Sequence, residues 1–264
     1  MRRECKEPKF SYVICTTPRS GSTLLTTTLG QTGVAGKPDE SITLSFREEV
    51  RRAKQLGTQD FREYIERAIT ASTTENGVFG TKLHAFQTMA FLTRISEFRS
   101  EPIVSLQAAF NRQFPNTRYI FLTRGEKVKQ AISYYRALMT DEWHRLSKTG
   151  EIERVAGPIS FDQYGIKKSL AFIERSDAYW ESYFKAHKLS PLRLTYEELV
   201  GSYESSIRRV LDFLGLPADV SVPGQVVQKM GDERAIAWEK EFLSLEKVAP
   251  ATVSILSDIL LAPY

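Results

Sequence analysis

Cysteine is scarce in this chain of 264 residues, which contains only Cys5 and Cys15. Two cysteines cannot form a disulfide framework, and Cys15 lies in an apolar run where a free thiol packs as a small hydrophobic side chain. The two cysteines and three histidines are scattered and do not have the spacing of metal ligands. We therefore expect a protein of a reducing compartment, the cytoplasm, that binds no metal.

Long hydrophobic runs are also absent. No apolar segment approaches the ~20 residues that a membrane-spanning helix needs. The charged start, Met1 to Lys6, leads into an apolar run that is too short for the core of a signal peptide. We therefore expect neither a transmembrane segment nor a leader.

Charge of one sign does not accumulate in blocks. The net charge is +4, from 36 Lys and Arg against 32 Asp and Glu, and no basic stripe interleaved with aromatics indicates a nucleic-acid partner. A small polyanionic ligand accounts for this mild excess. No linker rich in Pro, Gly or Ser divides the chain, and 42% apolar residues suffice for one large core, so we predict a single domain over 1–264.

The chain alternates between strand and helix patterns. Apolar runs bounded by turn residues predict strands at 10–15, 77–83, 117–123 and 191–195. Helical periodicity predicts helices at 22–32, 46–72, 85–113, 126–146, 160–188 and 203–214. This alternation is typical of an α/β fold, a parallel sheet with helices on both faces, whose ligands bind at the carboxyl ends of the strands.

The segment after the first strand is typical of a phosphate-binding loop. Turn residues follow the apolar run Phe10 to Cys15, and a helical pattern starts at Ser22. Such a segment directs backbone N–H groups and the helix dipole at an anion, while Gly21 permits close approach and Arg19 supplies a charged fork. The alternative is an ordinary helix with a Ser or Thr cap.

A nucleoside-triphosphate site does not fit. The stretch Gly30 to Lys37 is glycine-rich, but Gln31 and Pro38 break the Walker A spacing and no strand precedes it. The loop after the first predicted strand carries Arg19 where P-loop NTPases place a lysine. These residues therefore favour a P-loop kinase less than another kind of phosphate-binding protein.

Two further sets of polar residues follow predicted strands or the first helix. Arg124 ends one strand, and Ser133 lies in the next helix, so both can reach one anion; a salt bridge between Arg124 and Glu126 is the alternative. Asp39 and Glu40 lie in the loop after the first helix, where a carboxylate can face the phosphate loop or remain solvated.

Four motifs in order resemble the bacterial trehalose 2-sulfotransferase family: residues 17–25, 32–40, 80–83 and 124–137, with weaker similarity at 228–238. The resemblance implies a P-loop NTPase-like fold, a homodimer, and 3′-phosphoadenosine 5′-phosphosulfate (PAPS) as sulfate donor. It also implies that Arg124 and Ser133 bind the 3′-phosphate and that Glu40 is the general base. The 5′-phosphosulfate would be bound by the loop residues Thr17, Arg19, Ser20, Gly21, Ser22 and Thr23.

His84 is a competing candidate for the base, because an imidazole titrates near neutrality. We expect the acceptor near Pro18, Lys37, Asp39, Glu40, Ser41, Lys82, His84 and Trp143, with further aromatic candidates at Phe46, Tyr134, Tyr135 and His144. Relatives commonly show an aromatic pair after the glutamate, where this chain has Ser41 and Ile42. We therefore expect as acceptor a small molecule or glycolipid bearing a carbohydrate, such as a trehalose-like disaccharide.

The sequence therefore predicts a PAPS-dependent carbohydrate sulfotransferase that works by direct in-line transfer, in which Arg19 stabilises the departing phosphate and Glu40 accepts the proton. Two alternatives remain: a P-loop kinase acting on a small molecule, and a non-catalytic module that binds adenosine 3′,5′-bisphosphate (PAP), the desulfated form of PAPS.

Overall fold

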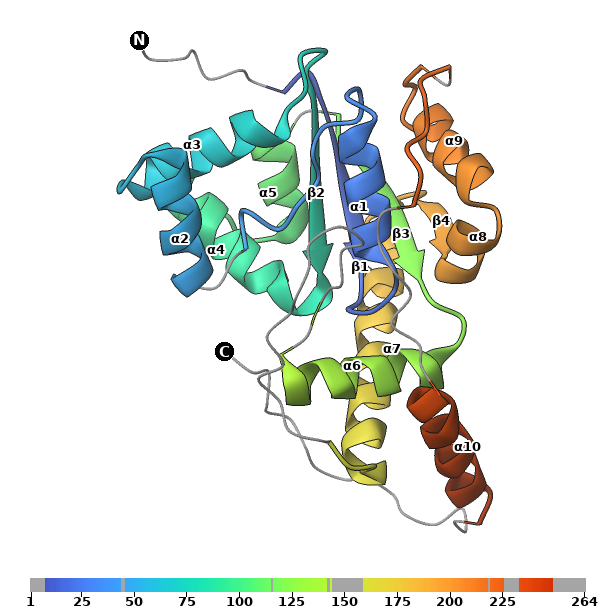
Figure 1. Ribbon diagram of the computed structural model, residues 1–264. Helices are drawn as coiled ribbons and strands as arrows, with labels where there is room; N and C mark the ends of the chain where they lie inside the picture. The colour runs from blue at the N-terminus through green and yellow to red at the C-terminus, as the bar shows by residue number, and fades with distance from the viewer. Residues whose placement is uncertain are drawn as a thin grey trace.

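Figure 1 shows the computed structural model, in which helices pack on both faces of a central parallel sheet. It describes residues 8–43, 46–114, 116–141, 143, 159–217, 219–225 and 233–248. Within these ranges the sheet has four strands, β1 (Phe10–Thr16), β2 (Val78–His84), β3 (Arg118–Thr123) and β4 (Leu192–Thr195). The strand order is β2-β1-β3-β4, and every neighbouring pair is parallel.

The two faces of β1 contact different helices, because successive side chains of a strand point to opposite sides. Tyr12 and Ile14 pack with α1 (Ser22–Gln31), α8 (Tyr196–Gly201) and α9 (Tyr203–Phe213). Val13 and Cys15 pack on the other face with α3 (Phe61–Ser72), α4 (Thr88–Arg99), α5 (Leu106–Gln113) and α7 (Gln163–Ala186). Burial on both faces explains why the strands are continuous apolar runs.

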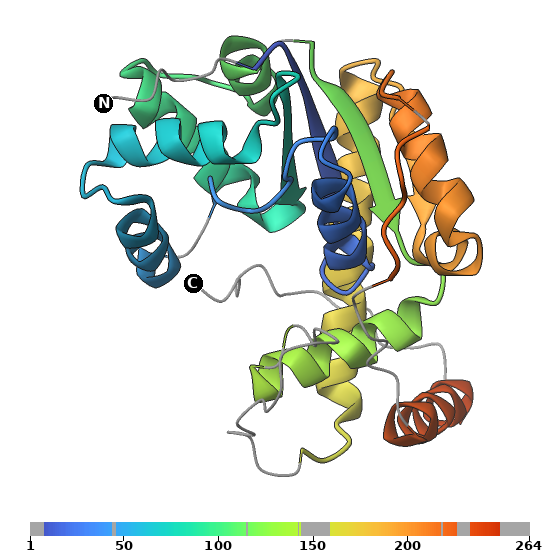
Figure 2. The ribbon, with the colours of Figure 1, turned by 45° about the horizontal axis from the view of Figure 1, so that its top comes forward.

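A third apolar cluster lies beyond the carboxyl ends of the strands. It joins α6 (Lys127–Thr140), α10 (Glu233–Val248) and the N-terminal half of α7, through residues such as Tyr135, Ile166 and Trp238. Figures 1 and 2 show α6 crossing below the ends of β1 and β3. The carboxyl edge of the sheet is thus covered by a helix that follows β3.

The predicted α/β class and the predicted strands are confirmed to within one residue. Two predicted helices are each divided in the structure. The segment 46–72 is divided into α2 (Phe46–Leu56) and α3, because Gly57 adopts a positive φ of 72° and the Asp60 side chain caps α3.

The segment 85–113 is likewise divided into a short 3₁₀ helix, η1 (Ala85–Gln87), followed by α4 and α5. Ser100 ends α4 in the left-handed conformation, and the Ser105 side chain caps α5. Helix α6 ends at Thr140, before the predicted 146, and helices α8 and α10 were not predicted. No helix in the described ranges is long and apolar enough to cross a membrane.

Candidate active site

The loop between β1 and α1 is a tight turn fixed to the neighbouring strand. Arg19 and Gly21 adopt positive φ angles of 66° and 84°. The Ser20 hydroxyl lies 2.6 Å from Thr16 Oγ1, which itself donates to the Leu122 carbonyl of β3 at 2.9 Å. The loop therefore leads directly into the N-terminus of α1, whose first N–H groups have no intrahelical acceptor.

Gly21 is enclosed by the side chain of Tyr196, the first residue of α8. A Cβ atom at position 21 would lie 2.5 Å from the Tyr196 ring. The same ring carries the Arg124 guanidinium at 4.7 Å from its centroid. Tyr196, which the sequence reasoning missed, thus connects the phosphate-type loop with the arginine at the end of β3.

Arginines gather beside this loop. Arg19 donates from Nε to the Ser133 hydroxyl at 2.9 Å and from Nη1 to the Trp143 carbonyl. Burial, together with the Arg124 and Arg136 guanidiniums, lowers the pKa of Arg19 to about 10. The Arg19, Arg124 and Arg136 side chains, which we call the arginine cluster, create a positive potential that an anion would relieve.

Arg124 is the member of the cluster with an unsatisfied donor. Its side chain is 12% exposed, and it approaches Glu126 and Glu197 only at 3.7 and 4.0 Å. The buried Nε atom has no hydrogen-bond partner in the described part of the chain. Such a buried donor is costly to leave without an acceptor, so this atom is the unsatisfied polar group of the arginine cluster.

Glu40 lies in a second polar cluster at the end of β2. Its carboxylate contacts Lys82 Nζ and Gln87 Nε2, each at 2.6 Å, and lies 3.7 Å from His84 Nε2. Burial acts to raise the pKa of Glu40, but the Lys82 ammonium and His84 outweigh burial and hold it well below the usual range. Glu40 is therefore an ionised carboxylate.

Asp39 and Glu40 have different surroundings although they are adjacent. Asp39 pairs with Thr81 in a single parallel bridge, and its carbonyl accepts from the Lys82 N–H at 2.9 Å. The Asp39 carboxylate accepts from the backbone N–H and the hydroxyl of Ser41. Glu40, by contrast, faces Lys82 and His84, so the structure separates the two acids that the sequence left as alternatives.

The two clusters meet at the ends of β1 and β2. Thr16 and His84 are register partners, and His84 Nδ1 lies 3.4 Å from the Thr16 carbonyl oxygen. The Trp180 indole of α7 donates to the same oxygen at 3.2 Å. The β1–α1 loop begins directly after Thr16, so His84 lies between this loop and the ionised Glu40.

Several predicted residues have other surroundings. Lys37 is exposed and packs beside Gly30, near the opposite end of α1 from the loop. Trp143 contributes its carbonyl to Arg19, while its indole N–H donates to Asp141 at 2.9 Å. The Pro18 carbonyl accepts from Gln130 at 2.8 Å. His144 lies outside the described residues, as do residues 228–232 of the weaker 228–238 motif.

Other polar residues at the site were missed. Gln130, fully buried in α6, fixes Pro18, and Gln87 orients Glu40. Asp177 of α7 accepts from the Thr17 hydroxyl and pairs with Lys127. Gln130 lies within the 124–137 motif, so the sequence resemblance could have identified it as a site residue. Asp177 gave no such signal, since an isolated acid in a long amphipathic helix is normally a surface residue.

Two cavities border these clusters. One of about 430 Å³ includes Arg124, and its other charges are largely paired within its walls, as in Lys127 with Asp177 and Arg193 with Glu181. The other, of about 240 Å³, lies between Glu40 and α2. Among the residues that the structure describes, no group of three or more His, Cys, Asp or Glu could hold a metal ion.

Comparison with known proteins gave consistent matches. The family model for Stf0 sulphotransferase matches residues 11–244. Trehalose 2-sulfotransferase of Mycolicibacterium smegmatis is 25% identical over 261 residues, which cover 88% of this chain and 94% of that protein. Trehalose 2-sulfotransferase of Mycobacterium tuberculosis is 25% identical over 258 residues, with 86% and 92% covered.

Two solved structures are also similar. A sulfotransferase from Alicyclobacillus acidocaldarius aligns with a TM-score of 0.46 and 15% identity, covering 90% of this chain and 92% of that one. The sulfotransferase domain of the Synechococcus PCC 7002 olefin synthase aligns with a TM-score of 0.45 and 16% identity, covering 98% and 94%.

The contact between Gly21 and Tyr196 gives a first prediction. Gly21→Ala should lower the free energy of unfolding by about 2–4 kcal/mol, because the methyl group meets the Tyr196 ring and the positive φ is strained. Urea unfolding measures the effect. Gly201→Ala is the control, since nothing lies within 4 Å of a Cβ there. Equal stability of the two variants would contradict the close packing of Gly21.

Proposed function

Because the chain belongs to the Stf0 sulphotransferase family, we propose that it transfers a sulfuryl group from PAPS to a hydroxyl group of a carbohydrate. The family match and the two curated relatives confirm the resemblance inferred from the four sequence motifs. The observation that carries the proposal is the partly buried arginine cluster beside the β1–α1 loop, with the unpaired Arg124 Nε as its clearest feature.

The residues present fit a donor with two separate anionic groups. The N-terminus of α1, with Thr17, Arg19 and Ser20 to Thr23, would bind the 5′-phosphosulfate. Arg124 and Ser133 would bind the 3′-phosphate. The Ser133 oxygen already accepts from Arg19, so its O–H remains able to donate to a phosphate oxygen.

PAPS, when bound, supplies the sulfuryl group; the chain supplies the proton acceptor and the positive charge. In a direct in-line transfer, the acceptor oxygen bonds to sulfur while the bond from sulfur to the 5′-phosphate oxygen breaks. Glu40 would take the proton of the attacking hydroxyl. Lys82 and His84 keep Glu40 ionised, and Arg19 would stabilise the negative charge on the departing phosphate.

The acceptor class is supported by the relatives and by the chemistry around Glu40. Both curated relatives are named trehalose 2-sulfotransferases. The residues next to Glu40 are mostly polar, which suits a hydroxyl-rich acceptor or glycolipid headgroup. We further propose that the chain is a single-domain, cytoplasmic enzyme that works as a homodimer without a metal.

The arginine cluster predicts selectivity for PAP. PAP should raise the melting temperature far more than AMP or ATP, because only PAP has the 3′-phosphate that Arg124 and Ser133 would bind through charge-assisted bonds of about 1.5–3 kcal/mol each. Arg124→Ala should abolish that preference. Arg118→Ala, at the opposite end of β3, is the matched control.

Equal shifts with PAP and AMP would contradict the 3′-phosphate assignment. A larger shift with ATP would instead favour a kinase. Strong PAP binding without sulfate transfer to any acceptor would favour a non-catalytic module.

The separation of Asp39 from Glu40 predicts different effects of two matched substitutions. Glu40→Gln should lower kcat by about 100-fold or more while PAP binding is retained, because the amide cannot accept the proton. Asp39→Asn should lower it much less, since Asp39 accepts hydrogen bonds from Ser41. Steady-state kinetics with His84→Ala completes the test. A larger loss at His84 than at Glu40 would favour the histidine as base.

The lowered pKa of Glu40 predicts the pH dependence of kcat. A carboxylate whose pKa is depressed stays ionised as the pH falls, so activity should persist to pH values below the usual range of glutamate, roughly 4.3. A pH–rate profile over the range in which the protein stays folded measures this. An acid limb between roughly pH 6 and 7 would point to a histidine base.

A further inference from the structure

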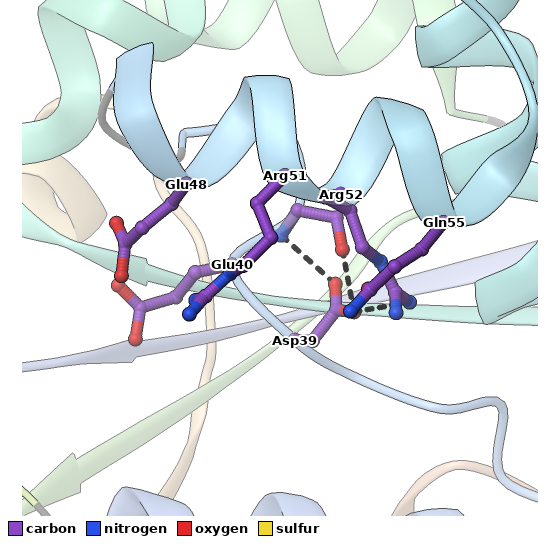
Figure 3. A pocket seen from close by; sticks show the side chains of 7 residues that line it. Asp39, Glu40, Glu48, Arg51, Arg52 and Gln55 are labelled. Atoms are coloured by element: carbon purple, nitrogen blue, oxygen red, sulfur yellow. Dashed lines mark hydrogen bonds and ion pairs between the residues drawn. The ribbon is translucent and has the colours of Figure 1, made fainter.

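Helix α2 presents a polar stripe to the segment that contains Glu40. The stripe residues are four apart or three apart in sequence and so lie on one face of the helix: Glu48, Arg51, Arg52 and Gln55. Together with Asp39, Glu40 and Ser41 they line the cavity of about 240 Å³ (Figure 3). One wall of this cavity therefore comes from α2, and the other carries the proposed base.

Packing on the other side of α2 fixes the direction of the stripe. Ala53 and Leu56 pack against the apolar core beside β2, and Glu49 forms an ion pair with Arg94 of α4. These contacts turn the polar stripe toward Asp39 and Glu40. The wall is thus held by the core and does not depend on contacts inside the cavity.

Two donors on this wall have no partner. Within the described part of the chain, the side chains of Arg51 and Gln55 make no hydrogen bond or ion pair. Arg52, in contrast, lies 3.8 Å from the Asp39 carboxylate. Figure 3 shows the side chains of Arg51 and Gln55 extending from α2 toward the Asp39–Glu40 segment. Both side chains are available to a molecule in the cavity.

We propose that Arg51 and Gln55 recognise the acceptor and that the cavity holds one uncharged, hydroxyl-bearing sugar ring. This inference rests on the proposed function, because it takes Glu40 as the base. Three carboxylates line the cavity beside two arginines, so an acidic acceptor would meet like charges, whereas hydroxyl groups can donate to carboxylates and accept from Arg51 and Gln55.

The size of the cavity limits what it encloses. Its volume of about 240 Å³ lies below the roughly 300–1,000 Å³ of pockets that enclose a drug-sized ligand. A single ring beside Glu40 fits this space, and the remainder of a disaccharide or glycolipid would extend outside. The enzyme should therefore select the ring that receives the sulfate more strictly than the group attached to it.

Substitutions on α2 test the recognition wall. Arg51→Ala and Gln55→Ala should raise the KM for the acceptor by about tenfold or more, with the KM for PAPS nearly unchanged, because each removes donors to acceptor hydroxyls. Arg51→Lys should restore only part of the affinity, since it keeps the charge without the planar fork. Lys54→Ala is the matched control, exposed on the same helix but outside the cavity. Acceptor KM values equal to that of the control would overturn the assignment.

Acceptor analogues test the size and charge of the bound ring. Methyl α-D-glucopyranoside and trehalose should be sulfated with kcat/KM values within about tenfold of each other, whereas the methyl glycoside of glucuronic acid should be at least about tenfold poorer. Preference for the glucuronide, or a strict requirement for the second ring, would overturn the inference.

A binding measurement separates this inference from the proposed function. Saturation-transfer NMR of methyl α-D-glucopyranoside with PAP-loaded protein should give a signal for the unmodified chain and for Lys54→Ala, and a much weaker one for Arg51→Ala. This result can be obtained without turnover. Absence of PAP binding or of transfer by the unmodified chain would contradict the proposed function, whereas equal NMR signals for all variants would contradict the role of α2.

Discussion

The register of the parallel strands β2, β1 and β3 is the constraint on which the site depends. Thr16 of β1 lies opposite His84 of β2 and Leu122 of β3, so all three strands deliver their last residues to one edge. A shift by one residue would reverse the side chains of a strand between the two buried faces, which is prohibitive when both faces are packed. The core thereby fixes the positions of the β1–α1 loop, His84 and Arg124 at this edge.

Opposite charges are arranged differently on the two sides of this edge. Around Glu40, a carboxylate is matched by Lys82 and further stabilised by Gln87 and His84, so the group is ionised and nearly satisfied. Around Arg19, burial and neighbouring arginines leave positive charge in excess and an unpaired Arg124 Nε. One side holds an ionised carboxylate, and the other carries an excess of positive charge. This combination would suit the transfer of a sulfuryl group from an anionic donor, such as a phosphosulfate, to a hydroxyl group.

Local sequence signals predicted the strands better than the helices. The strand ends were found because turn residues and charges bound short apolar runs, as at Thr16 and Arg124. Two predicted helices joined elements that the structure separates, because the helical pattern continues across the break between them. Each break depends on single residues: Gly57 with Asp60, and Ser100 with Ser105. Tyr196 and Asp177, which support the loop from other elements, could not be found from the sequence, since their roles come from contacts across large sequence separations.

The sequence by itself determined the α/β class and the identity of the family, because each depends on local patterns, short strands and short motifs, that can be read along the chain. Only the tertiary structure decided that Glu40, rather than Asp39, faces Lys82 and His84, and that Arg51 and Gln55 line the cavity beside it. Sequence composition and local secondary-structure propensity do not distinguish these two adjacent acids. What distinguishes them is the bridge between Asp39 and Thr81, which orients the loop on β2 and is made by packing between elements 42 residues apart.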